Sequence, residues 1–438
     1  MHGSVNLHTI TGADMGTGQS WSNTAARTLL RRLFDAAIGS AAPANVLAAH
    51  LPEKPSGRCI VVGAGKAAGA MAQAVEAAWA DVDLSGVVVA PYGYGTSAGR
   101  IRVLEAGHPV PDKASEDAAR EIMSSVSGLT GDDLVLALIS GGGSAAMALP
   151  ATGLTLAEKQ ETTRILLKSG LDIRTMNVVR RRLSAIKGGR LAAAAAPARM
   201  VTLGISDIPG DDPAAIASGP TMPDHDLDFD MAPVLARVGH LLPPAVAARL
   251  ARPSDASFPA GEVDFRMIAT PGKALAAAAE VAREAGVEPV ILGDDLEGEA
   301  AELGRQMASL ALSPIDRPTV FLSGGETTVT IGQGPAGRGG RNTEFLLALA
   351  GELNGAAGVW AIAGDTDGED GATGGVAGAI IAPDTILRGR GQGMEQAAYL
   401  ANHDSGSFFE GIGDLVVTGP TRTNVNDFRA ILVVPKVA

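Results

Sequence analysis

The sequence predicts an α/β protein made of two α/β domains, and two patterns indicate this fold class. Short apolar runs rich in Val, Ile and Leu alternate with longer Ala-rich helical segments, as in mostly parallel sheets covered by helices. The alternation breaks over residues 223–262, where prolines interrupt short helical segments, as is typical of a domain boundary. We therefore expect a flexible extension over 1–21, a Rossmann-like, mostly parallel domain over 22–230, and a smaller mixed-sheet domain over 231–438.

The first domain is expected to begin with an amphipathic helix over 22–38, in which leucines recur on one face. Further along, Thr155 and Glu158 have capping-box spacing, which starts a helix near residue 156. Apolar runs predict the strands, which lie at 59–62, 86–90, 101–104, 133–140 and 200–205. The other helices are expected at 66–79, 114–126 and 175–196, with Gly188 and Gly189 as a weak point inside the last.

The second domain shows the same alternation with a different set of boundaries. Thr270 followed by Pro271 fits an N-cap and a proline at the first helical position, so a helix should begin there. The helices are expected at 271–285, 297–310 and 342–353. The strands are expected at 264–269, 290–293, 319–323, 328–331, 359–363, 415–417 and 430–434.

Composition excludes several classes of partner. The net charge of −13 and the 3% aromatic content argue against broad binding of nucleic acid or of anionic membranes. The longest apolar runs fall short of the roughly 18 residues that a membrane span requires. The single Cys59 cannot pair within the chain, which favours a reducing cytoplasm. An anionic substrate would therefore need local basic residues.

The stretch from Gly63 to Gly69 reads as a strand, a tight turn and a helix that opens at Lys66. A helix start attracts anions through its free N–H groups, and Gly65 with Lys66 would place an ammonium at the same point. The spacing is one residue longer than the dinucleotide fingerprint, and Ala67 stands where a Walker A loop needs Ser or Thr. The stretch therefore predicts a phosphate or carboxylate contact, and a simple turn with a solvated lysine is the alternative.

Two glycine turns also follow buried strands. They are Ser140-Gly141-Gly142-Gly143-Ser144 and Ser323-Gly324-Gly325-Glu326. Consecutive glycines allow backbone N–H groups to cradle an anion, and ligands of open α/β sheets lie at the carboxyl ends of strands. Plain tight turns are the alternative. Ser144 does not fit an acylation nucleophile, because the flanking pattern is not G-x-S-x-G.

Basic side chains cluster in two places in this acidic protein. The helix over 175–196 carries Arg180, Lys187 and Arg190 among its cations, although a solvated face would explain about half of them. The glycine-rich segment 332–340, followed by Arg341 and Asn342, is a loop able to close over phosphates, with a flexible hairpin tip as the alternative.

Acidic residues gather at two strand ends. Asp365 and Asp367 lie in a dense acidic turn that suits a hard cation such as Mg²⁺, but the turn does not match an EF-hand. Asp207 follows another strand. Turn formation and helix capping are the alternatives for both clusters. His108, between Gly107 and Pro109, either orients a substrate hydroxyl or is a plain turn histidine.

Taken together, these residues resemble the class II glycerate kinases, the glycerate 2-kinase family whose C-terminal part is called the MOFRL domain. The matching stretches are 63–68, 108–112, 140–145, 179–191, 206–220, 323–327, 339–344 and 365–371, in the family's order. The resemblance implies two α/β domains with the active site in the cleft between them. It also implies ATP-dependent phosphorylation of D-glycerate to 2-phosphoglycerate with a divalent metal. Thr343 and Glu369 depart from the family pattern, which affects only local contacts.

The resemblance carries the family's important lysine, Ser-Asp aspartate and Gly-Gly-Arg-Asn arginine onto Lys66, Asp207 and Arg341. We expect Lys66 and Arg341 to stabilise the transferring phosphoryl group, and Asp207 to accept or orient the proton of the 2-hydroxyl. Asp365 and Asp367 would hold the metal or its water shell. The substrate and phosphate contacts are expected from Gly65, His108, Ser140, Gly141, Gly142, Gly143, Ser144, Lys187, Arg190, Ser323, Gly324, Gly325, Glu326 and Asn342.

Two other functions are compatible with the sequence. An NAD(P)-dependent hydroxypyruvate reductase is the main alternative, and some members of the family formerly carried that label. A regulator that binds a sugar acid or nucleotide without turnover is the other. The expected partners are small molecules, with ATP and Mg²⁺ or another divalent cation as cofactors, and a homodimer is left open.

Overall fold

A computed structural model describes residues 21–254, 263–332, 336–371 and 373–435, so residues 1–20 of the extension expected over 1–21 lie outside the described residues. The chain packs into two compact units. The first unit contains residues 38–274 and 420–426. The second contains the described residues before 38, those from 275 to 419, and those after 426.

The first unit is built on a six-stranded sheet in which every pairing is parallel. The strand order β3-β2-β1-β4-β5-β6 is that of a doubly wound dinucleotide-binding sheet. Strands β1 and β4 are buried along their whole length, because helices cover both faces of a parallel sheet. The strands are β1 (Cys59–Ala64), β2 (Leu84–Pro91), β3 (Ile101–Ala106), β4 (Leu134–Ile139), β5 (Arg199–Ile205) and β6 (Asp264–Ala269).

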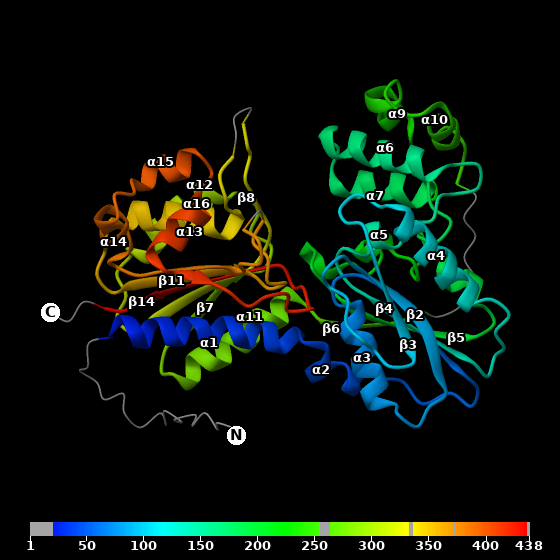
Figure 1. Cartoon of the computed structure of the whole chain (residues 1–438), viewed down its shortest axis with the longest axis horizontal. Helices are drawn as coiled ribbons and strands as arrows, with labels where there is room; N and C mark the ends of the chain where they lie inside the picture. Colours follow the sequence, from blue (N-terminus) through cyan, green and yellow to red (C-terminus); the bar gives the residue numbers. More distant parts are fainter. Residues whose placement is uncertain (1–20, 255–262, 333–335, 372, 436–438) are drawn as a thin grey trace. The chain divides into compact units, whose positions relative to one another are not determined.

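Helices of the first unit form two apolar cores. One core packs alternate residues of β1, such as Ile60 and Val62, against Ala118 and Ile122 of α4. A separate core joins α6, α7, α9 and α10, which lie away from the sheet (Figure 1). The helices are α2 (Pro43–Val46), α3 (Ala68–Ala78), α4 (Lys113–Ser125), α5 (Gly143–Ala146), α6 (Leu156–Lys168), α7 (Ile173–Arg182), α8 (Arg190–Ala195), α9 (Ala232–Val238) and α10 (Pro244–Leu250).

The second unit has a mixed six-stranded sheet in the order β13-β12-β11-β14-β9-β7. Only β7 and β9 pair in parallel, and the other pairings are antiparallel. A two-stranded pairing of β8 with β10 lies apart from this sheet. The strands are β7 (Glu288–Gly293), β8 (Gly298–Glu299), β9 (Thr319–Ser323), β10 (Thr327–Thr328), β11 (Val359–Asp365), β12 (Gly378–Ile381), β13 (Leu415–Val416) and β14 (Asp427–Val433).

Helices cover both faces of the second sheet. α12, α13 and α16 pack on one face, where Phe345 and Phe408 lie in the apolar core, and α1 and α11 lie on the other (Figure 1). The helices are α1 (Asn23–Ala41), α11 (Pro271–Glu284), α12 (Ala300–Ala311), α13 (Arg341–Leu353), α14 (Thr385–Gly391), α15 (Gln396–Ala401) and α16 (Ser405–Ile412). The predicted fold class, a parallel α/β domain and a mixed-sheet α/β domain, is confirmed.

The two units differ from the expected domain limits at both ends. The first unit continues to residue 274 because β6 pairs in parallel with β5 and completes its sheet. Most of α1 belongs to the second unit, where Asn23 accepts a hydrogen bond from the Trp360 indole at 2.9 Å and Phe34 lies against Phe428. The pattern of apolar residues identified these elements but could not show which sheet each one joins.

The helix expected over 175–196 is two helices. α7 ends at Arg182 and α8 starts at Arg190, with Gly188 and Gly189 between them at φ of 59° and 79°. Glycine adopts this left-handed conformation without the steric cost that a side chain brings. The weak point noted in the sequence is therefore a turn that redirects the chain.

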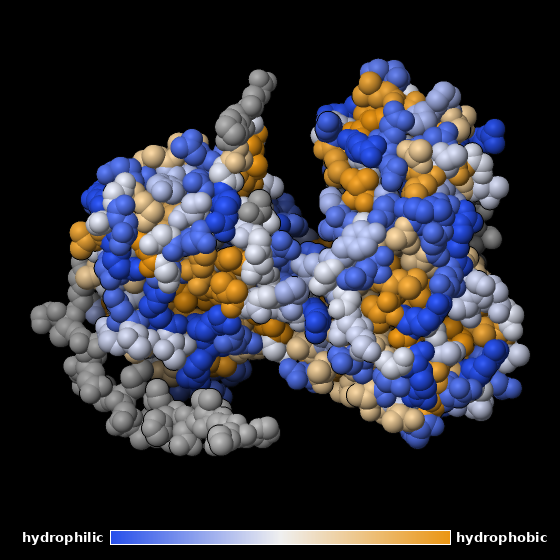
Figure 2. Space-filling view, viewed as in Figure 1, coloured by the Kyte–Doolittle hydropathy of each residue, from blue (hydrophilic) through white to orange (hydrophobic). Residues whose placement is uncertain are grey.

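The outer surface mixes residue types. The visible face of each unit has hydrophilic residues interspersed with hydrophobic ones (Figure 2). Among the described helices, none is both long enough and apolar enough to cross a bilayer.

Candidate active site

The Lys66 turn joins the carboxyl ends of β1 and β4. The amide of Lys66 donates to the carbonyl of Gly141 at 2.8 Å, and the amide of Ala67 donates to Ser140 Oγ at 3.1 Å. Gly65, at φ 129°, lies so close to Ser140 that a Cβ would meet its carbonyl oxygen at 2.4 Å. The two strand-end turns predicted to bind an anion are therefore packed directly on each other.

This packing corrects one part of the expectation. Helix α3 begins at Ala68, not at Lys66, and the amides of Lys66 and Ala67 donate to the neighbouring turn. The contact with an anion predicted here would therefore come from the lysine side chain rather than from these two amides. The half-buried Lys66 ammonium lies 5.8 Å from the centroid of the Tyr94 ring, close enough for a cation–π contact.

Asp207 lies against the glycine turn that follows β4. An ideal Cβ on Gly141 would meet Asp207 Oδ2 at 1.7 Å, so only glycine lets the carboxylate take this position. The same oxygen accepts a hydrogen bond from Asn424 Nδ2 at 2.9 Å. Through Gly141, the structure places Asp207 beside the Lys66 turn, as the strand-end argument predicted. Asn424 was missed, because it reaches the site from a loop more than two hundred residues away in the chain.

A small pocket of about 170 Å³ opens next to this turn. Four predicted contact residues line it, namely His108, Gly142, Ser144 and Lys187. The remaining lining residues are Pro109, Pro111, Ala145, Lys159, Thr163 and Arg180. The sequence reasoning missed Lys159, because a lysine on an amphipathic helix ordinarily faces solvent.

The pocket is cationic, and its two lysines are buried. Lys159 and Lys187 are 7% and 1% exposed, although lysines are almost never buried without a counter-charge. Their ammonium groups donate to main-chain carbonyls, Lys187 to Met147 at 2.8 Å and Lys159 to Leu183 at 3.3 Å. None of the described residues that line the pocket carries a carboxylate.

Burial and mutual repulsion shift the pKa values of these groups. Burial, helped by the charge of Arg180, lowers the pKa of Lys159 from 10.5 to about 8. Burial, together with Lys159 and Arg180, holds the pKa of Lys187 well below its ordinary value. Burial also lowers the pKa of Arg180. An anion in the pocket would compensate all three charges at once.

Other predicted residues hold the scaffold together. Arg190 donates to the carbonyls of Lys187 at 2.9 Å and Arg181 at 3.2 Å, which fixes the turn between α7 and α8. Ser144 Oγ lies 3.0 Å from Ser218 Oγ. Both Ser218 and the preceding residue, Ala217, have positive φ. Strained residues of this kind persist where the surrounding structure fixes them, and they cluster at functional sites.

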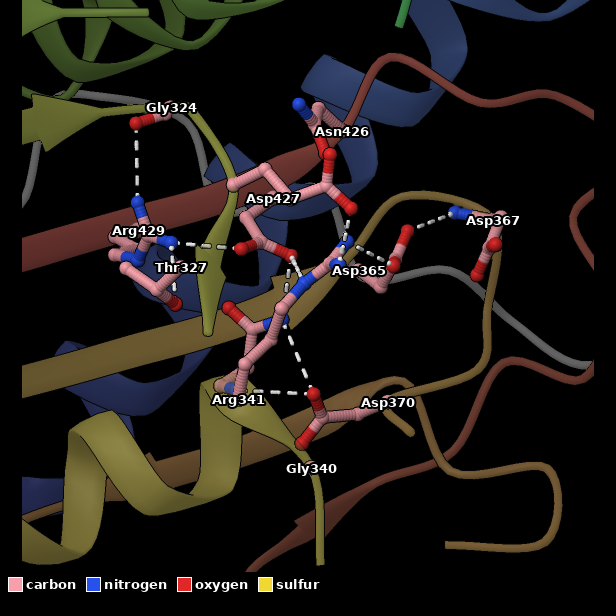
Figure 3. Close-up of polar contacts among 12 residues, drawn as sticks. Gly324, Thr327, Gly340, Arg341, Asp365, Asp367, Asp370, Asn426, Asp427 and Arg429 are labelled. Atoms are coloured by element: carbon pink, nitrogen blue, oxygen red, sulfur yellow. Dashed lines mark hydrogen bonds and ion pairs between the residues drawn. The ribbon is translucent and has the colours of Figure 1, made fainter. Parts of the chain in front are cut away.

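Arg341 is the centre of an ion-pair network in the second unit (Figure 3). Its guanidinium donates to Asp427 at 2.8 Å, to Glu326 at 2.6 Å and to Asp365 at 2.9 Å. Burial lowers the pKa of Arg341, but the three carboxylates outweigh it and raise the pKa above its ordinary value. The side chain is held in place by elements α13, β11 and β14. Its predicted role on a phosphoryl group stays a prediction.

A second layer of contacts fixes this network. Asn342 Nδ2 donates to Asp427 at 2.8 Å. The buried Arg429 pairs with the other oxygen of Asp427 at 2.7 Å (Figure 3). Arg429 also donates to the carbonyl of Gly324 at 3.0 Å, which ties in the glycine turn after Ser323. Gly325, at φ 111°, lies so close to Leu296 that a Cβ would meet its amide nitrogen at 2.3 Å.

Asp370 holds the start of α13. Its carboxylate accepts hydrogen bonds from the amides of Asn342 and Thr343, both at 2.9 Å. Desolvation raises the pKa of Asp370 to about 6 against the effect of these bonds. Sequence reasoning missed Asp370, Asp427 and Arg429 as partners of Arg341, because they come from other strand ends and turns.

The acidic turn does not fit a directly bound metal. One oxygen of Asp365 accepts from the amide of Asp367 at 3.0 Å, and the other pairs with Arg341. Asp367 accepts from the amide of Glu369 at 2.8 Å, a turn-forming bond. In the described part of the chain, no group of three or more His, Cys, Asp or Glu residues is arranged to hold a metal ion. Asp365 and Asp367 are therefore not arranged to coordinate a metal ion directly.

The fold and its strand-end sites define an α/β protein with a cationic pocket beside the glycine turn that follows β4. Residues 29–251 match the family described as a domain of unknown function (DUF4147), and residues 319–427 match the MOFRL family. A protein of Agrobacterium vitis with a provisional hydroxypyruvate reductase name is 56% identical, over 94% of this chain and 96% of that protein. The D-glycerate 2-kinase of Thermotoga maritima is 37% identical, over 90% of this chain and 94% of its own.

A solved structure agrees with these relatives. The crystal structure of glycerate kinase from Thermotoga maritima matches with a TM-score of 0.85 and 35% identity, covering 94% of this chain and all of that one. The chain belongs to the glycerate 2-kinase family with a C-terminal MOFRL domain.

Proposed function

We propose that this protein transfers the γ-phosphoryl group of ATP to the 2-hydroxyl of D-glycerate, giving 2-phospho-D-glycerate and ADP. Relatives named D-glycerate 2-kinase and glycerate kinase match over 90% or more of the chain. The observation that carries the proposal is the position of Asp207, whose carboxylate lies against Gly141 at the end of β4 and beside the Lys66 turn.

Asp207 is the group proposed to receive the hydroxyl proton. A general base must lie within hydrogen-bond reach of the proton that it takes. Gly141 lets the backbone lie close to the Asp207 carboxylate, and Asn424 Nδ2 donates to Asp207 Oδ2 at 2.9 Å. These two contacts fix the orientation of the carboxylate. The carboxylate would orient the 2-hydroxyl for attack on the γ-phosphorus and accept its proton as the O–P bond forms.

Lys66 and Arg341 are proposed to act on phosphate charge. Phosphoryl transfer relies on positioning and charge neutralisation more than on covalent help from the protein. The Lys66 ammonium lies at a strand-end turn, and the Tyr94 ring limits where its chain can point. For Arg341 we propose a contact with the nucleotide phosphates in exchange for one of its three carboxylates. ATP would enter as its complex with Mg²⁺ or another divalent cation, as a substrate.

The name of the Agrobacterium vitis relative makes a hydroxypyruvate reductase the second candidate. A nicotinamide cofactor would place its pyrophosphate on the amides of the first strand–helix turn. Here the amides of Lys66 and Ala67 donate to the neighbouring turn instead. Strand β2 also ends at Pro91 with no acidic residue to receive a ribose hydroxyl. These contacts favour the kinase.

The two functions are separated by one pair of assays on the purified full chain. We expect ADP release that depends on D-glycerate and on a divalent cation, and no oxidation of NADH or NADPH with hydroxypyruvate. L-glycerate serves as the matched control substrate. Oxidation of NADH or NADPH without ADP release would favour the reductase over the kinase. If neither activity is observed, the remaining function is that of a binding protein without turnover.

A further inference from the structure

The pocket that contains Lys159, Arg180 and Lys187 has no part in the phosphoryl-transfer steps proposed for Lys66, Asp207 and Arg341, yet it is costly to the fold. Three cations share a pocket of about 170 Å³, and two of them are more than nine-tenths buried. Burying a charge is unfavourable unless it is paired, and like charges repel each other in a low dielectric. Buried charges that the fold does not compensate mark a candidate ligand site.

The surroundings narrow the class of ligand. His108, Ser144 and Thr163 add hydrogen-bonding groups to the lining. Each of the three cations also touches the protein through a neutral acceptor: the carbonyls of Leu183 and Met147 for the two lysines, and the side-chain oxygen of Asn177 for Arg180 at 3.0 Å. Neutral acceptors orient the cations without compensating their charge. The pocket is therefore arranged for a small anion.

The position of the pocket along the glycine turn links it to the proposed reaction. Gly141 touches Asp207, and the next residue, Gly142, lines the pocket and lies against the ring of His108, which a Cβ on Gly142 would meet at 3.3 Å. Consecutive Cα atoms are about 3.8 Å apart. In a 2-hydroxy acid the carboxylate and the hydroxyl are on neighbouring carbon atoms. A carboxylate bound at the Gly142 end would therefore leave a hydroxyl of the same small acid close to Asp207.

We propose that Lys159, Arg180 and Lys187 bind the carboxylate of the 2-hydroxy acid substrate. The proposal rests on the proposed function for the identity of the acid, but not for the binding of an anion. A phosphate group of the nucleotide is the other source of such an anion, and the experiment separates the two.

The variants are Lys159→Met and Arg180→Met, which keep most of the side-chain length and remove the charge. Arg164→Met is the matched control, because Arg164 is an exposed cation on the same helix as Lys159 and lies outside the pocket. Binding of D-glycerate and of ADP is measured by calorimetry on the full-length protein without turnover. Steady-state KM values for both substrates are measured in parallel.

We expect each pocket variant to weaken D-glycerate binding about 10- to 100-fold, as the loss of one charge-assisted hydrogen bond predicts, with ADP binding unchanged. Arg164→Met should bind both as the wild type does. Lys159→Met removes a buried cation and should therefore raise the melting temperature of the ligand-free protein. A loss of affinity in this variant would then not reflect misfolding. If that variant fails to fold, the less buried Arg180→Met carries the test.

The outcomes are distinguishable from a failure of the proposed function. Weaker ADP binding with normal D-glycerate binding would overturn the proposal in favour of a nucleotide phosphate. Unchanged binding of both ligands would overturn it altogether. If the wild type binds D-glycerate through the pocket but releases no ADP, the kinase fails and the carboxylate pocket stands.

Discussion

Replacing Gly141 with alanine should remove most of the activity while leaving the fold intact. The added Cβ would lie 1.7 Å from Asp207 Oδ2 and 2.3 Å from its Cγ, whereas ordinary contacts of a Cβ begin at 3.4 Å. The carboxylate oxygen must therefore retreat by about 1.7 Å. The atoms displaced belong to the end of a side chain, so the backbone can keep its place, but the hydrogen bond from Asn424 would be lost.

A displacement of about 1 Å from the productive geometry costs on the order of 10²-fold in rate, and a general base contributes about 10²- to 10⁴-fold. We expect Gly141→Ala to lower kcat by about 10²- to 10³-fold, measured as ADP release with saturating D-glycerate. Gly131→Ala is the control, since its Cβ would meet nothing within 4 Å. A folded Gly141→Ala protein with kcat within about threefold of the wild type would refute the role given to Asp207.

Three further predictions follow from other parts of the structure. Lys66→Met should lower kcat by about 10²- to 10³-fold, as the loss of one preorganised charge predicts, and normal turnover would remove Lys66 from the mechanism. Arg341→Met should cost about 3–5 kcal/mol in urea unfolding, because it removes the Arg341 cation from the buried Asp365 and leaves the buried Asp427 with Arg429 alone. Arg338→Met breaks only an exposed pair with Glu410 and should cost less than about 1 kcal/mol, so equal losses would contradict the network. Because the pKa of Lys159 is about 8 when folded and 10.5 ordinarily, the unfolded chain binds more protons between these values, and the free energy of unfolding should rise with pH across that window. Lys159→Met should flatten this rise in urea unfolding at several pH values, and an unchanged slope would be evidence against the buried charge.

The fold class was predictable because the buried strands appear in the sequence as continuous apolar runs. The runs at β1 and β4 end in glycines, and these glycines have no room for a Cβ, as at Gly65 and Gly141. What the pattern could not show is which strands share a sheet. For that reason β6 and α1 were assigned to the wrong side of the boundary, relative to the compact units that the structure forms.

The candidate site was predictable only where its residues sit in local motifs. Lys66, Asp207 and Arg341 each follow a glycine turn or end a strand, and such positions can be read from the chain itself. Asn424 and Asp427 come from distant segments, so only folding brings them to Asp207 and Arg341. Lys159 was missed for a different reason: its spacing on α6 does not distinguish a buried lysine from a solvated one.

The most direct measurement of the proposed reaction is the phosphorus NMR spectrum of the product formed from D-glycerate and ATP with Mg²⁺. We expect a phosphate ester split by the single proton on C2, together with one ADP for each ester formed. An ester split by the two protons on C3 would place the phosphate on the wrong hydroxyl, and no ester at all, with hydroxypyruvate reduced instead, would contradict the kinase.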